Sequence, residues 1–250
     1  MSQIVTIARR EIMSFFTSTM AYVVLTVWLL FFGIVFYALA LFFSSQPPGG
    51  GQNLLQAFFG GTTLFWLPLL IFAPVLTMRL LAEERASGTL EPLMTAPVTE
   101  LQVVLGKFVA ALVFWSLLWL PTLSYVWLAA RTGKDAVDFG AVSAAYLGLF
   151  CIGSFYMAIG LLMSAVAPNQ IVAAVLTFLV LGVLFVVGLL SYATLNDNTK
   201  AMFEYVGLWT QMGAFSKGII DTRHVVFDLS SALLALFLSV RVLQANRWQG

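Results

Sequence analysis

Charged residues are scarce in this 250-residue chain. They make up 9% of it, whereas hydrophobic residues make up 61%, and the mean hydropathy is +0.97. A soluble domain needs many more charged side chains to solvate its surface. The composition therefore excludes the soluble class and predicts an integral membrane protein.

The low net charge and the single cysteine exclude one class of partner and internal disulfides. The net charge is only +1, and a duplex binder needs a clustered basic patch, so no nucleic-acid partner is expected. The single cysteine, Cys151, lies in an apolar stretch. It has no partner for an internal disulfide, and we expect it to be a small buried apolar residue.

Motifs for catalysis are missing as well. His224 is the only histidine, which leaves no H-E-x-x-H metal site and no Ser-His pair inside a span. Gly106-Lys107 is followed by Phe108 and does not form the G-x-x-x-x-G-K-[ST] phosphate-binding loop. We therefore expect no catalytic residue, no metal and no cofactor in this chain.

Long apolar runs are what the sequence does contain. A helix needs about 20 apolar residues to cross a bilayer, and six runs meet this length within one predicted all-α domain covering residues 1–250. They are residues 20–43, 54–76, 103–130, 139–166, 171–193 and 225–243.

The last run carries Asp228 near its start and Arg241 near its end. We expect both side chains to reach the membrane interface, which leaves no ionisable residue near the bilayer midplane. This absence argues against an ion-coupled secondary transporter, because such proteins normally need acidic or polar groups at that depth.

Basic residues predict the orientation. Arg9 and Arg10 precede the first span, whereas the following loop "SSQPPGGGQN" has no Lys or Arg, which predicts cytoplasmic amino and carboxyl termini around six spans. Ala38-Leu39-Ala40 is similar to the small-residue cleavage site of a secretory signal peptide, but the apolar run before it is too long for a signal peptide.

The segment before the first span has helical periodicity. Residues 3–16 place apolar side chains along one side and the charged residues Arg9, Arg10 and Glu11 elsewhere, which predicts an amphipathic helix lying on the cytoplasmic leaflet. A frayed start to the first span is the alternative.

One charged island interrupts the first half of the chain. "RLLAEER" continues the second span in helix formers, Ser87-Gly88 breaks the helix, and Pro92 restricts the next helix to about one turn. Thr99 and Gln102 form a capping box for a helix that begins near Glu100. On its spacing alone, such a charged loop between two spans can simply be a topology signal without a binding role.

The sequence of this charged island resembles that of a known family. "AEERASGTLEPLMTAPVTELQVVLGKF" is similar to the segment after the second helix in type-2 ABC exporter permeases, closest to their gliding-motility (Gld-type) and nitrous-oxide-maturation (Nos-type) branch. "RREIMSFFTSTMAYV", "APNQIVAAVLTF" and "FSKGIIDTRHVVFDLS" resemble other parts of that family in the same order. Pro92 departs from the commoner apolar residue at its position.

The resemblance implies the type-2 ABC exporter fold and a complex in which the permease and the ATPase are separate chains. Two permease copies would pair with a dimer of ABC ATPase subunits that bind ATP and Mg, and residues 79–100 would be the cytoplasmic coupling segment in contact with the ATPase. The implied contact residues are Glu83, Glu84, Arg85, Ser87, Gly88, Thr89, Leu90, Glu91, Leu93, Met94, Thr95 and Pro97. The implied location is the bacterial inner membrane.

The resemblance also gives a role to residues 194–223. This outer segment would form short re-entrant or interfacial helices that cap the exit route, although docking of a periplasmic protein is an equal alternative. Its candidate residues are Phe203, Trp209, Phe215, Lys217 and Asp221.

The expected function is export of a lipid-like or amphipathic substrate, since the spans are almost free of charge. The alternative is a non-transporting subunit that transmits ATP-driven motion to envelope machinery. Membrane lipid is an expected partner in either case.

Overall fold

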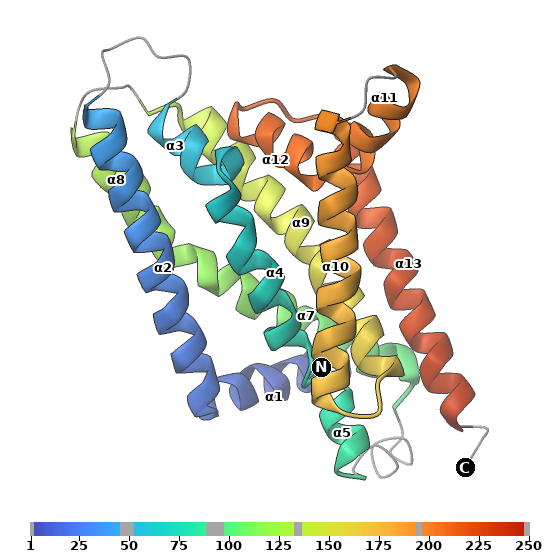
Figure 1. Cartoon of the computed structure of the whole chain (residues 1–250). Coiled ribbons are helices and arrows are strands. Elements are labelled where there is room, and N and C mark those ends of the chain that lie inside the picture. The colour runs from blue at the N-terminus through green and yellow to red at the C-terminus, as the bar shows by residue number, and fades with distance from the viewer. Residues whose placement is uncertain (1–2, 46–52, 89–97, 133–136, 194–196, 248–250) are drawn as a thin grey trace.

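The computed structural model describes residues 3–45, 53–88, 98–132, 137–193 and 197–247. Within these ranges every regular element is helical. Figure 1 shows the longest helices running side by side as a bundle, with shorter helices at both of its ends. The structure confirms the predicted all-helical membrane fold.

The long helices coincide with the apolar runs. They are α2 (Thr19–Ser44), α4 (Thr63–Thr77), α7 (Glu100–Trp119), α9 (Phe139–Val166), α10 (Gln170–Ala193) and α13 (Thr222–Arg247). In the described residues, 5 spans are long and apolar enough to cross a membrane by themselves. A sixth is completed by Leu54–Gly61 and Thr63–Thr77, which are bent by 42°.

Helix α9 is the most buried of these spans and lies at the centre of the bundle. Two of its glycines allow close approach of neighbouring helices. A Cβ at Gly153 would collide with the Trp115 indole of α7, and one at Gly160 would collide with Thr77 of α4. The Trp115 Nε1 also donates a hydrogen bond of 3.1 Å to the Leu149 carbonyl of α9.

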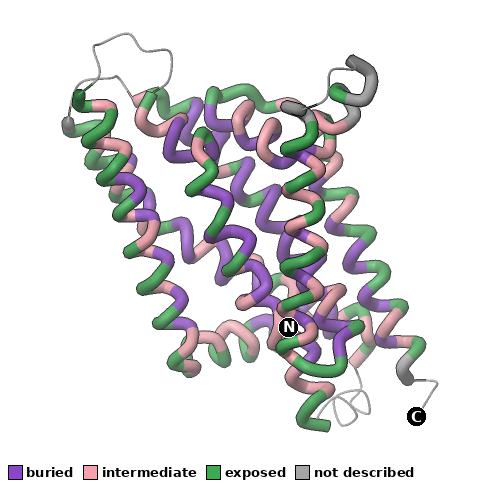
Figure 2. The backbone as a smooth tube through the Cα atoms, viewed as in Figure 1, coloured by how far each residue is buried: buried purple, intermediate pink, exposed green. Residues whose placement is uncertain are grey.

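Aromatic rings fill the core between α2 and α7. Trp28 is fully buried and contacts Trp119 edge-on at 4.9 Å and Phe32 at 4.6 Å between ring centroids. Edge-on and tilted pairs of this kind add to the stabilisation that comes from burial. Figure 2 shows this core as purple backbone inside the bundle, whereas outward-facing turns of the peripheral helices are exposed.

Proline shapes two of the spans. Pro68 and Pro74 lie inside α4, and Pro121 lies in the tight turn Leu120–Thr122 that joins α7 to α8 (Leu123–Thr132). Proline removes one backbone hydrogen bond and obstructs the preceding turn, so a helix bends or tightens there. The third expected span is therefore two helices in line.

Shorter helices define the two ends of the bundle (Figure 1). Helix α1 (Gln3–Thr17) and helix α5 (Ala82–Ala86) lie at one end, hereafter the α1–α5 end. Helices α3 (Leu54–Gln56), α11 (Asp197–Val206) and α12 (Leu208–Ser216) lie at the other, the α3–α12 end. The chain segments predicted to contact other proteins are thus at opposite ends.

Candidate functional site

Helix α1 crosses the α1–α5 end and packs against α7. A Cβ at Gly106 of α7 would lie 2.7 Å from the Ile7 side chain, so the absence of a side chain there permits the contact. Further along, the rings of Phe15 and Phe114 stack at 4.9 Å. Arg9 and Arg10 remain exposed, as the amphipathic pattern predicts.

The junction between α4 and α5 differs from the expected continuous helix. Helix α4 ends at Thr77, and the chain turns through Met78–Leu81 before α5 begins at Ala82. The Ser164 hydroxyl of α9 accepts hydrogen bonds of 3.0 Å from the backbone N–H groups of Leu81 and Ala82. A side chain of another span therefore supplies partners for the amides freed by the break.

A buried lysine joins three elements at this end. The Lys107 ammonium of α7 lies 2.7 Å from Glu11 of α1 and 2.8 Å from Glu84 of α5. The Lys107 side chain is only 2% exposed. A buried charge is tolerated when it is paired and hydrogen-bonded, so these three residues, the Lys107 cluster, hold α1, α5 and α7 in one arrangement.

A second cation, Arg79, connects the turn after α4 to the corner between α1 and α2. The Arg79 guanidinium donates to Glu83 at 2.9 Å and to the Ser18 hydroxyl at 3.1 Å. Ser18 is the residue that caps the start of α2 and accepts from the Met20 amide. The first turn of α5 is thereby connected to the start of the first span.

The third cation faces the link between α9 and α10. Arg85 donates to the carbonyl of Val166 at 3.2 Å and to that of Ala167 at 3.4 Å. Partial burial lowers the pKa of the Arg85 guanidinium. Ala82 of α5 packs there against Ala167 and Ala173, so α5 contacts this link through both polar and apolar groups.

Helix α5 ends at Ala86 with Ser87 as its C-cap, and the next residue, Gly88, has a φ of 70°, a conformation that glycine adopts readily. Ser87 and Gly88 are exposed. Of the predicted ATPase-contact residues, seven lie outside the described residues: Thr89, Leu90, Glu91, Leu93, Met94, Thr95 and Pro97.

The predicted start of the third span is confirmed. The Thr99 hydroxyl accepts from the Gln102 amide at 3.3 Å, and the Gln102 side chain accepts from the Thr99 amide at 3.0 Å. Helix α7 then begins at Glu100. The predicted coupling segment is therefore followed by a span whose first turn is fixed by its own capping box.

At the α3–α12 end, the candidate residues are spread over α11, α12 and the chain that follows. Phe203 and Trp209 are half-buried, whereas Phe215 is 1% exposed and contacts Gly148 of α9. Lys217 is exposed, and Asp221 accepts a hydrogen bond of 2.9 Å from the Arg223 amide. The structure does not gather these five side chains into one site.

The expectation for Asp228 was wrong. Asp228 does not reach an interface: it is 0% exposed between α13 and α9, and neither carboxylate oxygen has a hydrogen-bond partner among the described residues. Phe227, its neighbour, contacts Phe155 at 6.1 Å. An acidic residue therefore does lie inside a span, contrary to the sequence-based premise used against an ion-coupled transporter.

Three residues at the α1–α5 end were not singled out as site residues. Arg79 was predicted only as the first residue of the charged segment 79–100, Lys107 was considered only in the excluded phosphate-binding motif, and Ser164 was not considered. The available signal was a lysine in the first turns of a span, 23 positions after Glu84, an acidic residue that can pair with a buried lysine.

These features define a multi-pass helical membrane protein with a short polar helix anchored across one end of its spans. The chain matches the family model described as ABC-2 family transporter protein over residues 5–217, and it belongs to that family. A search among curated proteins gave no match. Membership makes the chain an ABC transporter permease; membrane subunits of this family generally work with a separate ABC ATPase and are generally not themselves catalytic.

Proposed function

We propose that this permease couples ATP hydrolysis by a partner ATPase dimer to export of a lipid-like or amphipathic substrate, and that residues 79–100 are the coupling segment. The Lys107 cluster is the observation that carries the proposal. Because α5 is fixed to α1, α7 and the α9–α10 link, a force applied to the segment reaches several spans together.

The connections are short and come from different directions. Glu84 contacts Lys107 at 2.8 Å on one side of α5, and Arg85 contacts the Val166 carbonyl at 3.2 Å on the other. Ser164 holds the start of α5 at 3.0 Å. A flexible loop would absorb movement of the ATPase, whereas a helix with these contacts transfers it to α7 and α9.

The side chains already used within the chain are poor candidates for direct contact with the ATPase. Glu84 and Arg85 hold α5 in place, so the ATPase contact belongs to the exposed turn at Ser87 and Gly88 and to the apolar residues Leu90 and Leu93. Apolar anchors of this kind carry much of the free energy of docking.

The remaining parts of the proposal follow from the family resemblance. Two copies of the chain pair with two ATPase subunits in a bacterial inner membrane, and the α1–α5 end faces the cytoplasm with both termini. The ATPase subunits bind the ATP and Mg. Helices α11 and α12 then lie on the outer side, where they cap the exit route or receive a periplasmic protein.

The docking site is tested by coexpression with the ABC ATPase whose gene lies nearest to that of the permease. Leu93→Asp is expected to reduce copurification of the ATPase, because a charge replaces an apolar anchor. Leu101→Asp is the matched control, since Leu101 is 53% exposed in the first turn of α7, just after the proposed coupling segment. Equal copurification with Leu93→Asp and the native chain would argue against this docking site.

The proposed export function is tested by measuring substrate transport and ATP hydrolysis in lipid discs. If an amphiphile stimulates hydrolysis and crosses between the leaflets, the export function is supported. If only a periplasmic protein stimulates hydrolysis and nothing crosses, the chain is instead a transmitter of mechanical work.

A further inference from the structure

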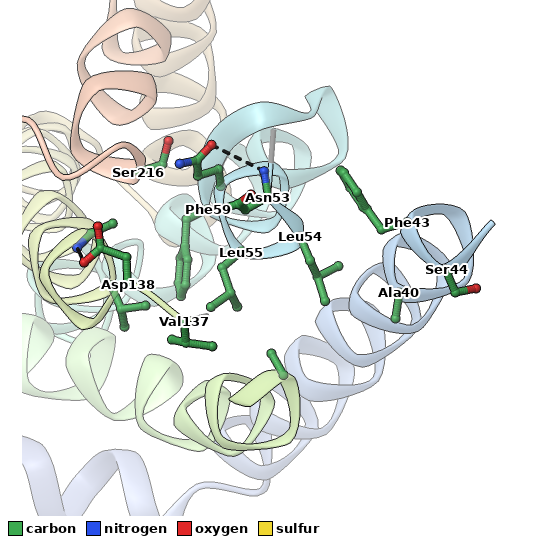
Figure 3. A pocket seen from close by; sticks show the side chains of 14 residues that line it. Ala40, Phe43, Ser44, Asn53, Leu54, Leu55, Phe59, Val137, Asp138 and Ser216 are labelled. Atoms are coloured by element: carbon green, nitrogen blue, oxygen red, sulfur yellow. Dashed lines mark hydrogen bonds between the residues drawn. The ribbon is translucent and has the colours of Figure 1, made fainter. Parts of the chain in front are cut away.

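A cavity of about 260 Å³ lies at the α3–α12 end, between α2, α3, α8 and the start of α9. Figure 3 shows the side chains that surround it, with Phe43 and Ala40 on one side and Phe59 and Val137 on the other. Its apolar lining residues are Ala40, Phe43, Leu54, Leu55, Phe59, Ala129, Val137, Ala141 and Val142. It is far from α5, which lies at the opposite end of the bundle.

The cavity has an apolar floor and a polar rim. Phe59, Ala141 and Val142 form the floor and are between 1% and 9% exposed. Ser44, Asn53 and Asp138 belong to the lining as well and are exposed. A ligand that matches this division has an apolar part that is buried and a polar part that stays near the rim.

The polar lining groups already make bonds within the chain. Ser44 donates to the Leu41 carbonyl at 2.7 Å, and Ser216 donates to the Gly213 carbonyl at 3.0 Å. The Gln56 side chain accepts from the Asn53 amide at 3.4 Å, the bond drawn dashed in Figure 3. The site is therefore suited to contact with apolar surface more than to a ligand that requires many hydrogen bonds.

The charge at the rim limits which charge the polar head group of the ligand can carry. Asp138 is the only charged residue among the described lining residues, and its Oδ1 accepts from the amides of Gly140 and Ala141 at 2.8 and 3.2 Å. An anionic head beside this carboxylate is disfavoured by like-charge repulsion. An uncharged polar head avoids that cost.

We infer that this cavity binds the chain of a single-tailed amphiphile whose polar head carries no negative charge. Its volume lies just below the range of about 300–1,000 Å³ usual for pockets that hold drug-sized ligands, so one chain fits where a two-chain lipid does not. The role of the occupant as cargo rests on the proposed export function, whereas its binding does not.

Binding is tested with purified permease alone in lipid discs, without ATP or ATPase. The probe is a monoacylglycerol with a diazirine in its chain, and the crosslinked peptides are identified by mass spectrometry. We expect labelling on Leu54, Leu55, Phe59 or Val137. The matching fatty acid, ionised at pH 8, is expected to compete poorly because of Asp138.

Two substitutions fill the cavity from different helices. Ala40→Phe on α2 and Ala129→Phe on α8 are each expected to reduce the labelling about tenfold or more, which corresponds to roughly 1.4 kcal/mol of binding free energy. Ala38→Phe and Ala130→Phe are the matched controls, because both alanines are exposed and neither lines the cavity. Unchanged melting temperatures establish that the variants remain folded.

Three results overturn the inference. One is labelling spread over the exposed apolar faces of the spans and unaffected by either cavity-filling substitution. Another is an equal loss of labelling in the controls. The third is competition by the fatty acid as strong as that by the unlabelled monoacylglycerol. Because ATPase coupling is absent from the assay, none of these results bears on the docking of residues 79–100.

Discussion

At the scale of single residues, Lys107 is a buried charge whose environment supplies two partners. It is nearly inaccessible, and two carboxylates from different elements compensate its charge at 2.7 and 2.8 Å. Removing one partner of a buried ion pair is costly because the remaining charge stays buried, typically by about 3–5 kcal/mol. The Lys107 cluster is therefore expected to stabilise the fold, and in the proposed function it also transmits force.

Lys107→Met tests this environment, because it leaves Glu11 and Glu84 facing each other without the cation. We expect the melting temperature of the permease to fall by about 6–12 °C, from a loss of about 3 kcal/mol at about 2–4 °C per kcal/mol. Thermal unfolding in detergent measures the change.

The matched control is Lys200→Met. Lys200 forms an exposed pair with Glu204 at 3.9 Å, and such pairs contribute about 0–1 kcal/mol. A similar fall in both variants would show that the Lys107 cluster has no special role in stability.

Asp228 is the opposite case, a buried carboxylate without a hydrogen-bond partner among the described residues. Asp228→Asn keeps its shape and removes the charge, so we expect the melting temperature to stay the same or rise. Thermal unfolding with and without the ATPase measures it. A fall of more than about 5 °C, or roughly 1–2 kcal/mol, would contradict this account and indicate that the charged form has a partner.

At the scale of elements, the break between α4 and α5 depends on a hydroxyl from α9. Ser164→Ala removes the shared acceptor of the Leu81 and Ala82 amides. Each unsatisfied buried amide costs about 1–3 kcal/mol, so we expect a lower melting temperature and weaker stimulation of the ATPase, with docking retained.

Ser143→Ala is its control, because that hydroxyl bonds only within α9, to the Gly140 carbonyl at 2.9 Å, and Ser143 is exposed. Melting temperature, copurification and ATP hydrolysis are measured on both variants. Loss of docking in Ser164→Ala would show that α5 is needed for assembly and not only for coupling.

Contact of α9 with α7 gives a further prediction. Gly153→Ala places a Cβ against the Trp115 indole, so we expect it to separate the helices and lower the melting temperature or the yield of folded protein. Gly213→Ala in α12 meets no atom within 4 Å and is expected to be tolerated. Equal stability of both variants would contradict the close packing around α9.

The elements were largely predictable from the sequence, since their signals are local. Apolar runs marked the long helices, Thr99 with Gln102 marked the start of α7, and Ser87-Gly88 marked the end of α5. The Lys107 cluster was not predictable in this way, because Lys107 and Glu11 are 96 positions apart and meet only after α1 has folded against α7.

Asp228 shows where reasoning from position in a span fails. Its place near the start of the apolar run suggested access to the interface. In the folded chain, α13 packs against the central α9 along its length, and this contact covers Asp228. Distance from the end of a run does not predict burial when another helix covers that face.

At the scale of the whole molecule, the two ends of the bundle have different chemistry. The α1–α5 end holds a charged arrangement that fixes a short helix to several spans, whereas the α3–α12 end holds an apolar cavity with a polar rim. The proposed export cycle joins them: the ATPase acts at the first end, and an amphiphile is handled at the second.

The most direct test measures ATP hydrolysis by the assembled permease and ATPase in lipid discs, with and without monoacylglycerol, for the native chain and for Lys107→Met. The account predicts that the amphiphile stimulates the native complex at least about threefold. It also predicts that Lys107→Met retains the ATPase while losing most of this stimulation at a temperature where it remains folded. Full stimulation in the folded Lys107→Met complex would contradict transmission through the Lys107 cluster.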